Sequence, residues 1–232
     1  MKNSGADRTR PLAIMGGAFD PVHYGHLRTA VELNDLLHLG ELRFVPSANP
    51  PHRSPHLASG EQRVKMLEAA ISELPWCSVD DREFKRQGPS WSVLTLEEIR
   101  SEIGIQSLCM ILGMDAFLGL PNWHRWTEIL EFAHIVVACR PGSQLPTDGL
   151  LGKLLATHGT KTLSDLQHAS AGCILVQEVT QLEISSSVIR ELLIHQQEVR
   201  YLLPETVVNI IEATGCYTAD ITAIKEQRPY AK

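Results

Sequence analysis

The chain has 232 residues, of which 44% are apolar, and this is enough to bury the core of one α/β domain. It carries 21 Lys and Arg residues against 27 Asp and Glu residues, which gives a net charge of -6. This balance argues against a general binder of nucleic acid or of an anionic membrane. We therefore expect neither among its partners, and any charge that binds phosphate must be local.

The cysteines and the start of the chain indicate a cytoplasmic protein. The five cysteines lie far apart, mostly inside apolar runs, and form no CxxC pair, which predicts reduced thiols. Residues 1–10 are polar and lack the apolar core of a signal peptide, so we expect a loose tail there. No apolar run approaches the ~20 residues of a membrane helix.

Short apolar runs with strand character alternate along the chain with segments of helical periodicity. The expected strands are Leu12–Met15, Leu42–Val45, Ser107–Leu112, His134–Ala138 and Cys173–Val176. The expected helices are His26–Leu37, Glu61–Glu73, Val93–Glu102, Trp126–Glu131, Val188–His195 and Glu205–Ala213. This order predicts a Rossmann-like, doubly wound α/β fold, with a mainly parallel sheet flanked by helices and further helices at the C-terminus.

The same elements predict one domain over residues 11–217, followed by a tail at 218–232. Within the domain, residues 141–172 are rich in Gly, Thr and Leu and have weak periodicity. They are expected to form a short helical insertion or a surface loop, and no chemistry is assigned to them.

The first strand leads into the segment that carries the most chemical information, IMGGAFDPVHYGHL at residues 14–27. Gly16 and Gly17 remove side-chain bulk at the strand end, so a nucleotide can approach the backbone closely. The helix that follows offers free N–H groups and a partial positive charge to phosphate. In an open α/β sheet, ligands bind at this position.

Two histidines stand at the start of that helix, three residues apart, and are expected to share a face. With Gly25 leaving room for a phosphate between them, His23 and His26 can stabilise a pentavalent phosphorus. One alternative is that one histidine caps the helix while the other packs. Another is a metal site of Asp20, His23 and His26, which ranks lower because the preceding glycines are better explained by phosphate.

The segment resembles the signature of the HxGH nucleotidyltransferases, and GGAFDPVHYGHL is similar to that of bacterial nicotinate-nucleotide adenylyltransferases. The resemblance implies transfer of the adenylyl group of ATP to nicotinate mononucleotide, giving nicotinate adenine dinucleotide and pyrophosphate in NAD biosynthesis. Mg²⁺ is expected to travel with ATP, without protein ligands. One departure is Ala18, where the family more usually has Ser or Thr, so that contact falls to backbone amides or to another residue.

Three later segments match the family's mononucleotide side, to which Gly17 also contributes. The run SANPPHR implies that Asn49, His52 and Arg53 lie near the acceptor; alone, it would be a surface turn. The run WSVLTL implies a substrate contact for Thr95, although Ser90 or Ser92 as a helix cap is the commoner role of such a run. Trp123 is expected to stack on the nicotinate ring, whereas Trp126 is expected in the core.

Two further segments match the ATP side. Gly113 and Asp115 follow a strand, where the carboxylate can accept ribose hydroxyls or cap a helix. The string ISSSVIR is similar to the family's ISSTxIR, which grips the ATP phosphates, although serines at a helix start are usually caps. The expected ATP-binding residues are Gly16, Gly17, Ala18, Phe19, His23, Gly25, His26, Gly113, Asp115, Ile184, Ser185, Ser186, Ser187 and Arg190.

The expected mechanism is direct in-line attack of the acceptor phosphate on the α-phosphorus of ATP. His23, His26 and Arg190 are expected to neutralise the growing charge. Three alternatives stay open: another acceptor, such as nicotinamide mononucleotide or phosphopantetheine; a nucleotide-binding sensor without catalysis; and a metal-dependent hydrolase. Monomer and homo-oligomer are equally compatible with the sequence.

Overall fold

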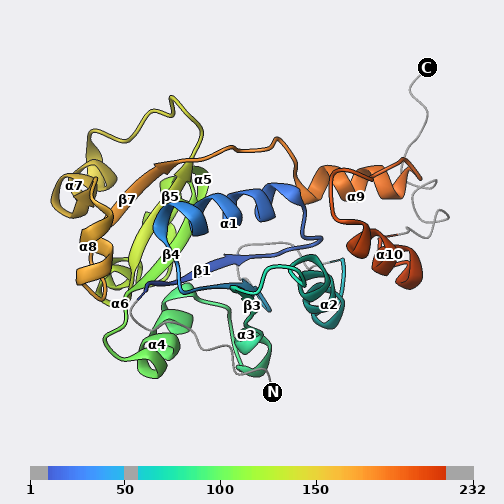
Figure 1. The fold of residues 1–232 in the computed structure, drawn as a ribbon, viewed down its shortest axis with the longest axis horizontal. Helices are drawn as coiled ribbons and strands as arrows, with labels where there is room; N and C mark the ends of the chain where they lie inside the picture. The colour runs from blue at the N-terminus through green and yellow to red at the C-terminus, as the bar shows by residue number, and fades with distance from the viewer. Residues whose placement is uncertain (1–9, 50–56, 218–232) are drawn as a thin grey trace.

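A computed structural model describes residues 10–49 and 57–217. Its seven strands form one sheet in the order β3-β2-β1-β4-β5-β7-β6, and every pairing is parallel (Figure 1). The strands are β1 (Leu12–Gly17), β2 (Glu41–Pro46), β3 (Cys77–Val79), β4 (Leu108–Gly113), β5 (His134–Cys139), β6 (Gly159–Thr160) and β7 (Ile174–Glu178). The expected tails at 1–10 and 218–232 lie outside the described residues, Arg10 excepted.

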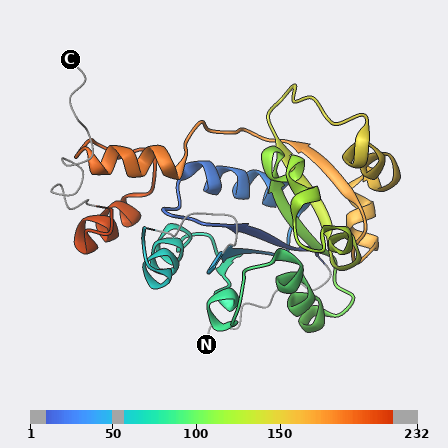
Figure 2. The same cartoon turned by 180° about the vertical axis from the view of Figure 1, so that it is seen from behind.

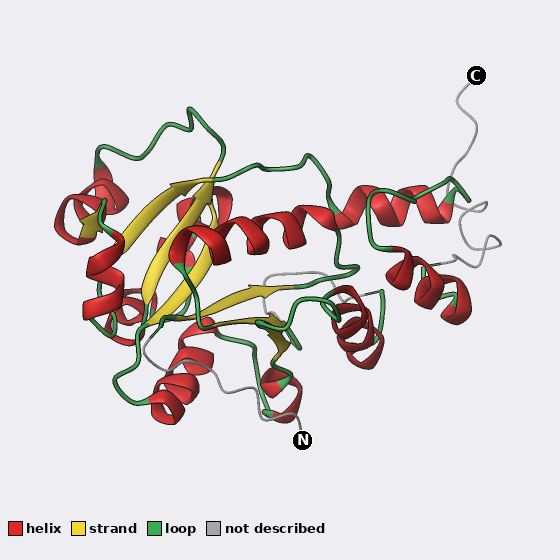
Figure 3. Ribbon diagram, in the orientation of Figure 1, coloured by secondary structure: helices red, strands yellow, loops and turns green. Residues whose placement is uncertain are grey.

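Helices cover both faces of the sheet, so the expected doubly wound fold is confirmed (Figures 2 and 3). One face packs against α1 (Tyr24–Leu37), α2 (Gly60–Ala70) and α8 (Leu163–His168); α9 (Ser186–Ile194) and α10 (Glu205–Thr214) extend the same core beyond the end of the strands, where α10 packs against α2. The other face packs against α4 (Ser92–Ile103), α5 (Met114–Leu118), α6 (Ile129–Phe132) and α7 (Gly149–His158). A short helix, α3 (Arg82–Lys85), follows β3.

Side-chain alternation along each strand creates these two cores. In β1, Ala13 and Met15 belong to the first core, whereas Leu12 and Ile14 belong to the second. A strand buried on both faces has no polar side to show, which is why these segments appear in the sequence as short continuous apolar runs.

The expected helices are present, with ends that differ by a few residues. α2 begins with a reciprocal cap, in which Ser59 Oγ accepts from the Gln62 N–H and Gln62 Oε1 accepts from the Ser59 N–H. Ser185 caps the start of α9, because its Oγ accepts a hydrogen bond from the Val188 N–H at 3.2 Å. The helix expected over Trp126–Glu131 is divided into a 3-10 turn at Trp126–Glu128 and α6.

Residues 141–172 are more closely built into the fold than an insertion or a surface loop would be. They contain α7, the strand β6 and α8, and β6 pairs with β7 as the last strand of the sheet. A strand of two residues is too short for its periodicity to be recognised, and the same holds for β3, which has three. The two outer strands of the sheet, β3 and β6, were therefore not predicted from the sequence.

The strand order reverses between β1 and β4, which lie side by side although β2 and β3 separate them in the sequence. The chain leaves β1 towards one side of the sheet, and leaves β4 towards the other. This divergence opens a crevice at the carboxyl ends of the two strands, where doubly wound proteins bind ligands. None of the helices in the described ranges is long and apolar enough to span a membrane.

Candidate active site

A cleft of about 1050 Å³ opens at the carboxyl ends of β1 and β4, and a smaller cavity of about 220 Å³ adjoins it. The two share one wall, the backbone from Gly16 to Ala18. The predicted ATP-binding residues that line the larger cleft are Gly16, Gly17, Ala18, Phe19, His23, His26, Gly113, Asp115, Ile184, Ser185, Ser186, Ser187 and Arg190. Of the predicted mononucleotide-binding residues, Gly17, Thr95 and Trp123 line the smaller cavity.

The two imidazoles at the start of α1 stack on each other. Their ring centroids are 3.8 Å apart with an interplanar angle of 27°, and the edge of Phe19 packs on His26 at 5.0 Å. The backbone N–H of His23 donates a hydrogen bond to Nδ1 of the His26 ring at 3.3 Å. Because this bond occupies Nδ1 as an acceptor, neutral His26 carries its proton on Nε2, which can then donate to a ligand.

Both imidazoles are uncharged near pH 7. His23 is only 5% exposed, and this burial lowers its pKa to about 4. Desolvation also lowers the pKa of His26 well below its ordinary value, and the neighbouring His23 acts in the same direction. A bound phosphate would favour the charged forms, so the free site holds two neutral rings that an anionic ligand can polarise.

Gly25 serves the ring of His23 rather than a phosphate. Stacking fills the space between the two imidazoles, so the expected room for a phosphate between them is absent. A Cβ on Gly25 would lie 3.0 Å from two atoms of the His23 ring. A glycine at this position therefore lets the ring lie flat against the start of the helix.

Asp20 is buried and ties distant segments together. Its Oδ2 accepts from the Leu57 N–H at 3.0 Å, and its Oδ1 accepts from the Ala58 N–H at 3.1 Å and the Tyr217 hydroxyl at 2.7 Å. Within the described ranges there is no cluster of three His, Cys, Asp or Glu side chains fit to hold a metal. Asp20 therefore has a structural role that the metal-site alternative did not foresee.

The start of α9 is hydrogen-bonded to the turn after β1. Arg190 donates from Nη1 to the Asp20 carbonyl at 2.7 Å and from Nη2 to Ser187 Oγ at 3.3 Å, and Ser186 Oγ donates to the Pro21 carbonyl at 2.9 Å. The guanidinium is thus held at the larger cleft, close in space to the histidine turn. Gly113 and Asp115 face the same cleft from the start of α5.

The smaller cavity is lined by aromatic rings and one buried carboxylate. Trp91 and His124 stack at 4.7 Å, and Trp123 lines the same space. Thr95 donates from Oγ1 to Glu83 at 2.9 Å and accepts from Arg86 at 3.2 Å, so protein groups already engage its hydroxyl. Trp126 packs against the second core, as expected.

Asn49 is the one remaining predicted mononucleotide-binding residue among the described residues, and it does not line the cavity. Asn49 is exposed, and its backbone N–H donates to Ser90 Oγ at 2.9 Å. Ser90 therefore holds the loop after β2 rather than capping α4. His52 and Arg53 lie outside the described residues.

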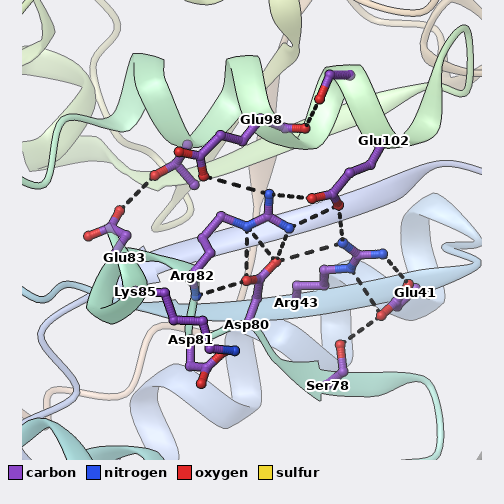
Figure 4. Close-up of polar contacts among 12 residues, drawn as sticks. Glu41, Arg43, Ser78, Asp80, Asp81, Arg82, Glu83, Lys85, Glu98 and Glu102 are labelled. Carbon is purple, nitrogen blue, oxygen red and sulfur yellow. Dashed lines mark hydrogen bonds and ion pairs between the residues drawn. The ribbon is translucent and has the colours of Figure 1, made fainter. Parts of the chain in front are cut away.

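A network of ion pairs fixes α3 and α4 against the edge of the sheet (Figure 4). Arg82 pairs with Asp80 at 2.6 Å and with Glu102 at 2.9 Å, and Arg43 pairs with Glu41 at 3.1 Å. Burial of Asp80 would raise its pKa, but hydrogen bonds and charge from Arg82 outweigh this and lower the pKa. Glu83, also on α3, lines the smaller cavity and accepts a hydrogen bond from the Thr95 hydroxyl.

Several lining residues escaped the sequence analysis. Arg140 directly follows β5, at the same carboxyl edge, and the rule used for Asp115 would have found it. No local pattern indicates Glu83, Gln181 or the link from Tyr217 to Asp20, because their partners are distant in the sequence.

Comparisons with known proteins agree with this geometry. A family model described as cytidylyltransferase-like matches residues 14–192. A probable nicotinate-nucleotide adenylyltransferase from Halorhodospira halophila is 45% identical over 212 residues, covering 90% of this chain and 95% of the relative. One from Aeromonas hydrophila is 44% identical over 207 residues, covering 89% and 97%. This chain belongs to the nicotinate-nucleotide adenylyltransferase family.

Solved structures confirm the fold of this family member. The Plasmodium falciparum nicotinic acid mononucleotide adenylyltransferase complexed with NaAD superposes with a TM-score of 0.67 at 16% identity, covering 90% of this chain and 97% of the neighbour. Family membership confirms the expected resemblance and the expected class of nucleotidyltransferase. The activity for which the family is named is the one that the sequence predicts.

Proposed function

We propose that the protein transfers the adenylyl group of ATP to nicotinate mononucleotide, forming nicotinate adenine dinucleotide and pyrophosphate in NAD biosynthesis. The observation that carries the proposal is the wall of Gly16, Gly17 and Ala18 that the two cavities share. ATP occupies the larger cleft and the pyridine ring the smaller cavity, so the acceptor phosphate and the α-phosphorus meet at this wall. Free thiols at all five cysteines support the cytoplasm as its location.

The reaction is a direct displacement. An oxygen of the acceptor phosphate attacks the α-phosphorus, the bond to the β-phosphate oxygen breaks, and pyrophosphate leaves with the electron pair. No proton must be removed from the acceptor, because its phosphate is already an anion near pH 7. Catalysis then consists of alignment and of stabilising the charge that grows on the α-phosphoryl oxygens.

His26, His23 and Arg190 are the groups proposed for this stabilisation. His26 offers the Nε2–H donor that its bond from the His23 N–H leaves free. Arg190 is anchored through Asp20 and Ser187, so its charge is fixed before ATP arrives. The dipoles of α1 and α9 add partial positive charge at the starts of these helices, which helps a chain of net charge -6 to bind two anions.

Mg²⁺ is proposed to arrive with ATP. The carboxylate oxygens of Asp20 already accept three hydrogen bonds from the protein, so Asp20 is not proposed as a ligand, and no other protein ligand is proposed. Phosphate and water oxygens, the ligands that Mg²⁺ prefers, would complete its shell. When bound, the ion neutralises part of the phosphate charge.

Pyrophosphate release from ATP tests the proposal, with nicotinate mononucleotide, nicotinamide mononucleotide and phosphopantetheine as separate acceptors. We expect release and a dinucleotide product with nicotinate mononucleotide at the highest kcat/KM. Preference for another acceptor would contradict the proposed substrate. ATP binding in calorimetry without pyrophosphate release would instead indicate a sensor. Loss of activity on adding a chelator at saturating Mg²⁺ would indicate a hydrolase that depends on a tightly bound transition metal.

A further inference from the structure

Arg63, on α2, lies directly behind the wall that the two cavities share. Its side chain is 1% exposed, although it carries a guanidinium. Nη1 donates to the Ala18 carbonyl at 2.7 Å and to the Ser47 carbonyl at 2.9 Å. One nitrogen therefore connects the turn after β1 to the loop after β2.

The two carbonyls belong to residues that line the cavities. Ala18 lines both of them, and Ser47 lines the smaller one. The Ser47 N–H also donates to the Gly17 carbonyl at 2.8 Å, so the two loops are joined directly as well. Arg63 joins the same two loops through its side chain, and so limits the distance between the wall of the ATP cleft and the rim of the acceptor cavity.

Burial lowers the pKa of Arg63, and the charges of two nearby buried carboxylates partly oppose that effect. Asp20, 3% exposed, and Glu83, 8% exposed, both act on the charge of Arg63. Each carboxylate is itself fixed: Asp20 by Leu57, Ala58 and Tyr217, and Glu83 by Thr95. A buried cation is costly without such partners, so its retention here calls for a reason beyond packing.

Close packing fixes the same side chain from another direction. The ring of Phe84 lies against the guanidinium, with its centroid 5.2 Å from Cζ. Phe84 in turn lies against Gly60, at the start of α2, where a Cβ would come within 2.4 Å of the ring. The guanidinium therefore has little freedom to follow the loops if they shift.

We propose that Arg63 is a positioning residue that sets the separation between the two bound nucleotides. The proposal rests on the proposed function, in which the acceptor phosphate and the α-phosphorus meet at the Gly16–Ala18 wall. A displacement of about 1 Å between reacting groups can cost on the order of 100-fold in rate. Arg63 touches neither substrate, so its loss should impair the reaction of the ternary complex more than the binding of either nucleotide alone.

Steady-state kinetics and calorimetry on Arg63→Met and Arg63→Lys test this inference. We expect kcat to fall about 100-fold in Arg63→Met and about 10-fold in Arg63→Lys, since an ammonium can still bond one carbonyl. The dissociation constants of ATP and of nicotinate mononucleotide, each measured alone, should change by less than about 3-fold. A higher kcat in Arg63→Lys than in Arg63→Met would show that Arg63 acts by donating hydrogen bonds to the carbonyls and does not merely fill space.

Arg100→Ala is the matched control. Arg100 also donates to backbone carbonyls, but at the opposite edge of the sheet, so this variant should lose stability and keep kcat at temperatures where it is folded. The inference is overturned if kcat of Arg63→Met stays within about 2-fold of the parent, if Arg63→Lys is no more active than Arg63→Met, or if single-substrate affinities fall as much as kcat. A parent protein that forms no dinucleotide would instead contradict the proposed function.

Discussion

An arginine donates to backbone carbonyls at the amino ends of the strands and another does so at their carboxyl ends, but the two have different roles. These two sides of the sheet are called the amino edge and the carboxyl edge below. At the amino edge, Arg100 donates to the carbonyls of Phe132, Gly104, Gln106 and Ser170, each at 2.6 to 3.0 Å, and closes the ends of three loops. At the carboxyl edge, Arg63 donates to two carbonyls behind an open cleft.

The difference lies in what remains unpaired. In the described part of the chain, three buried side-chain atoms have no hydrogen-bond partner: His23 Nδ1 and Arg63 Nε near the carboxyl edge, and Asn34 Oδ1 on α1. An unpaired buried polar group costs stability, and only His23 among these three residues lines the larger cleft, where a bound ligand can offset that cost. Stability should therefore respond to changes at one edge, and turnover to changes at the other.

The largest expected effect comes from His26→Ala, at the carboxyl edge. Loss of the Nε2–H donor should lower kcat by about 10²- to 10³-fold, as for other donors that stabilise a growing anionic charge. The free energy of unfolding should fall by only about 1 to 2 kcal/mol, through loss of the stacking on His23 and of the acceptor for the His23 backbone N–H, so the variant stays folded. Pyrophosphate release and urea titration measure the two quantities; full activity would remove His26 from the mechanism.

Arg100→Ala should have the opposite profile. Removing a guanidinium that satisfies four carbonyls should lower the free energy of unfolding by about 2 to 4 kcal/mol. Thermal unfolding followed by circular dichroism measures this loss of stability. At roughly room temperature, where the variant stays folded, kcat should be unchanged. A large fall in kcat with the fold intact would show that the two edges are coupled and do not have separate roles.

The pH dependence of stability should reveal the buried state of His23. Its pKa is about 4 in the folded protein and 6.5 when unperturbed, so the unfolded chain binds more protons between these values. This contribution to stability is present above pH 6.5 and is lost as the pH falls towards 4. From pH 7.5 to pH 5 the loss should be about 2 kcal/mol.

His23→Asn is the comparison protein for this measurement, because asparagine also suits the start of a helix. Urea titrations at both pH values should show a smaller pH effect in the variant than in the parent. Equal slopes in the two proteins would mean that His23 is not buried in its neutral form.

Ala18→Ser should have the smallest effect. The family more usually carries a hydroxyl at this position, and Ala18 lines both cavities. Restoring the hydroxyl should lower KM for ATP by about 2- to 5-fold, the value of one modest hydrogen bond, with kcat little changed. A rise in KM would indicate that the Ala18 backbone already supplies the contact and that the hydroxyl crowds it.

What the sequence could predict was local. The turn after β1, the serines of α9 and the alternation of strands and helices depend on residues close together in the chain, and all appear in the structure. Sequence gave no indication of contacts such as Tyr217 with Asp20, which are 197 residues apart. The stacking of His23 on His26 was likewise not predicted, because spacing places two rings on one face without fixing their angle.

A crystal structure with nicotinate adenine dinucleotide bound would show whether the two nucleotides meet at the Gly16–Ala18 wall. We predict that the adenylate phosphate lies within hydrogen-bonding distance of His26 Nε2, that the pyridine ring lies beside Trp123, and that the linkage between them crosses Ala18. A dinucleotide whose phosphates lie away from both imidazoles, or whose pyridine ring occupies the larger cleft, would contradict it.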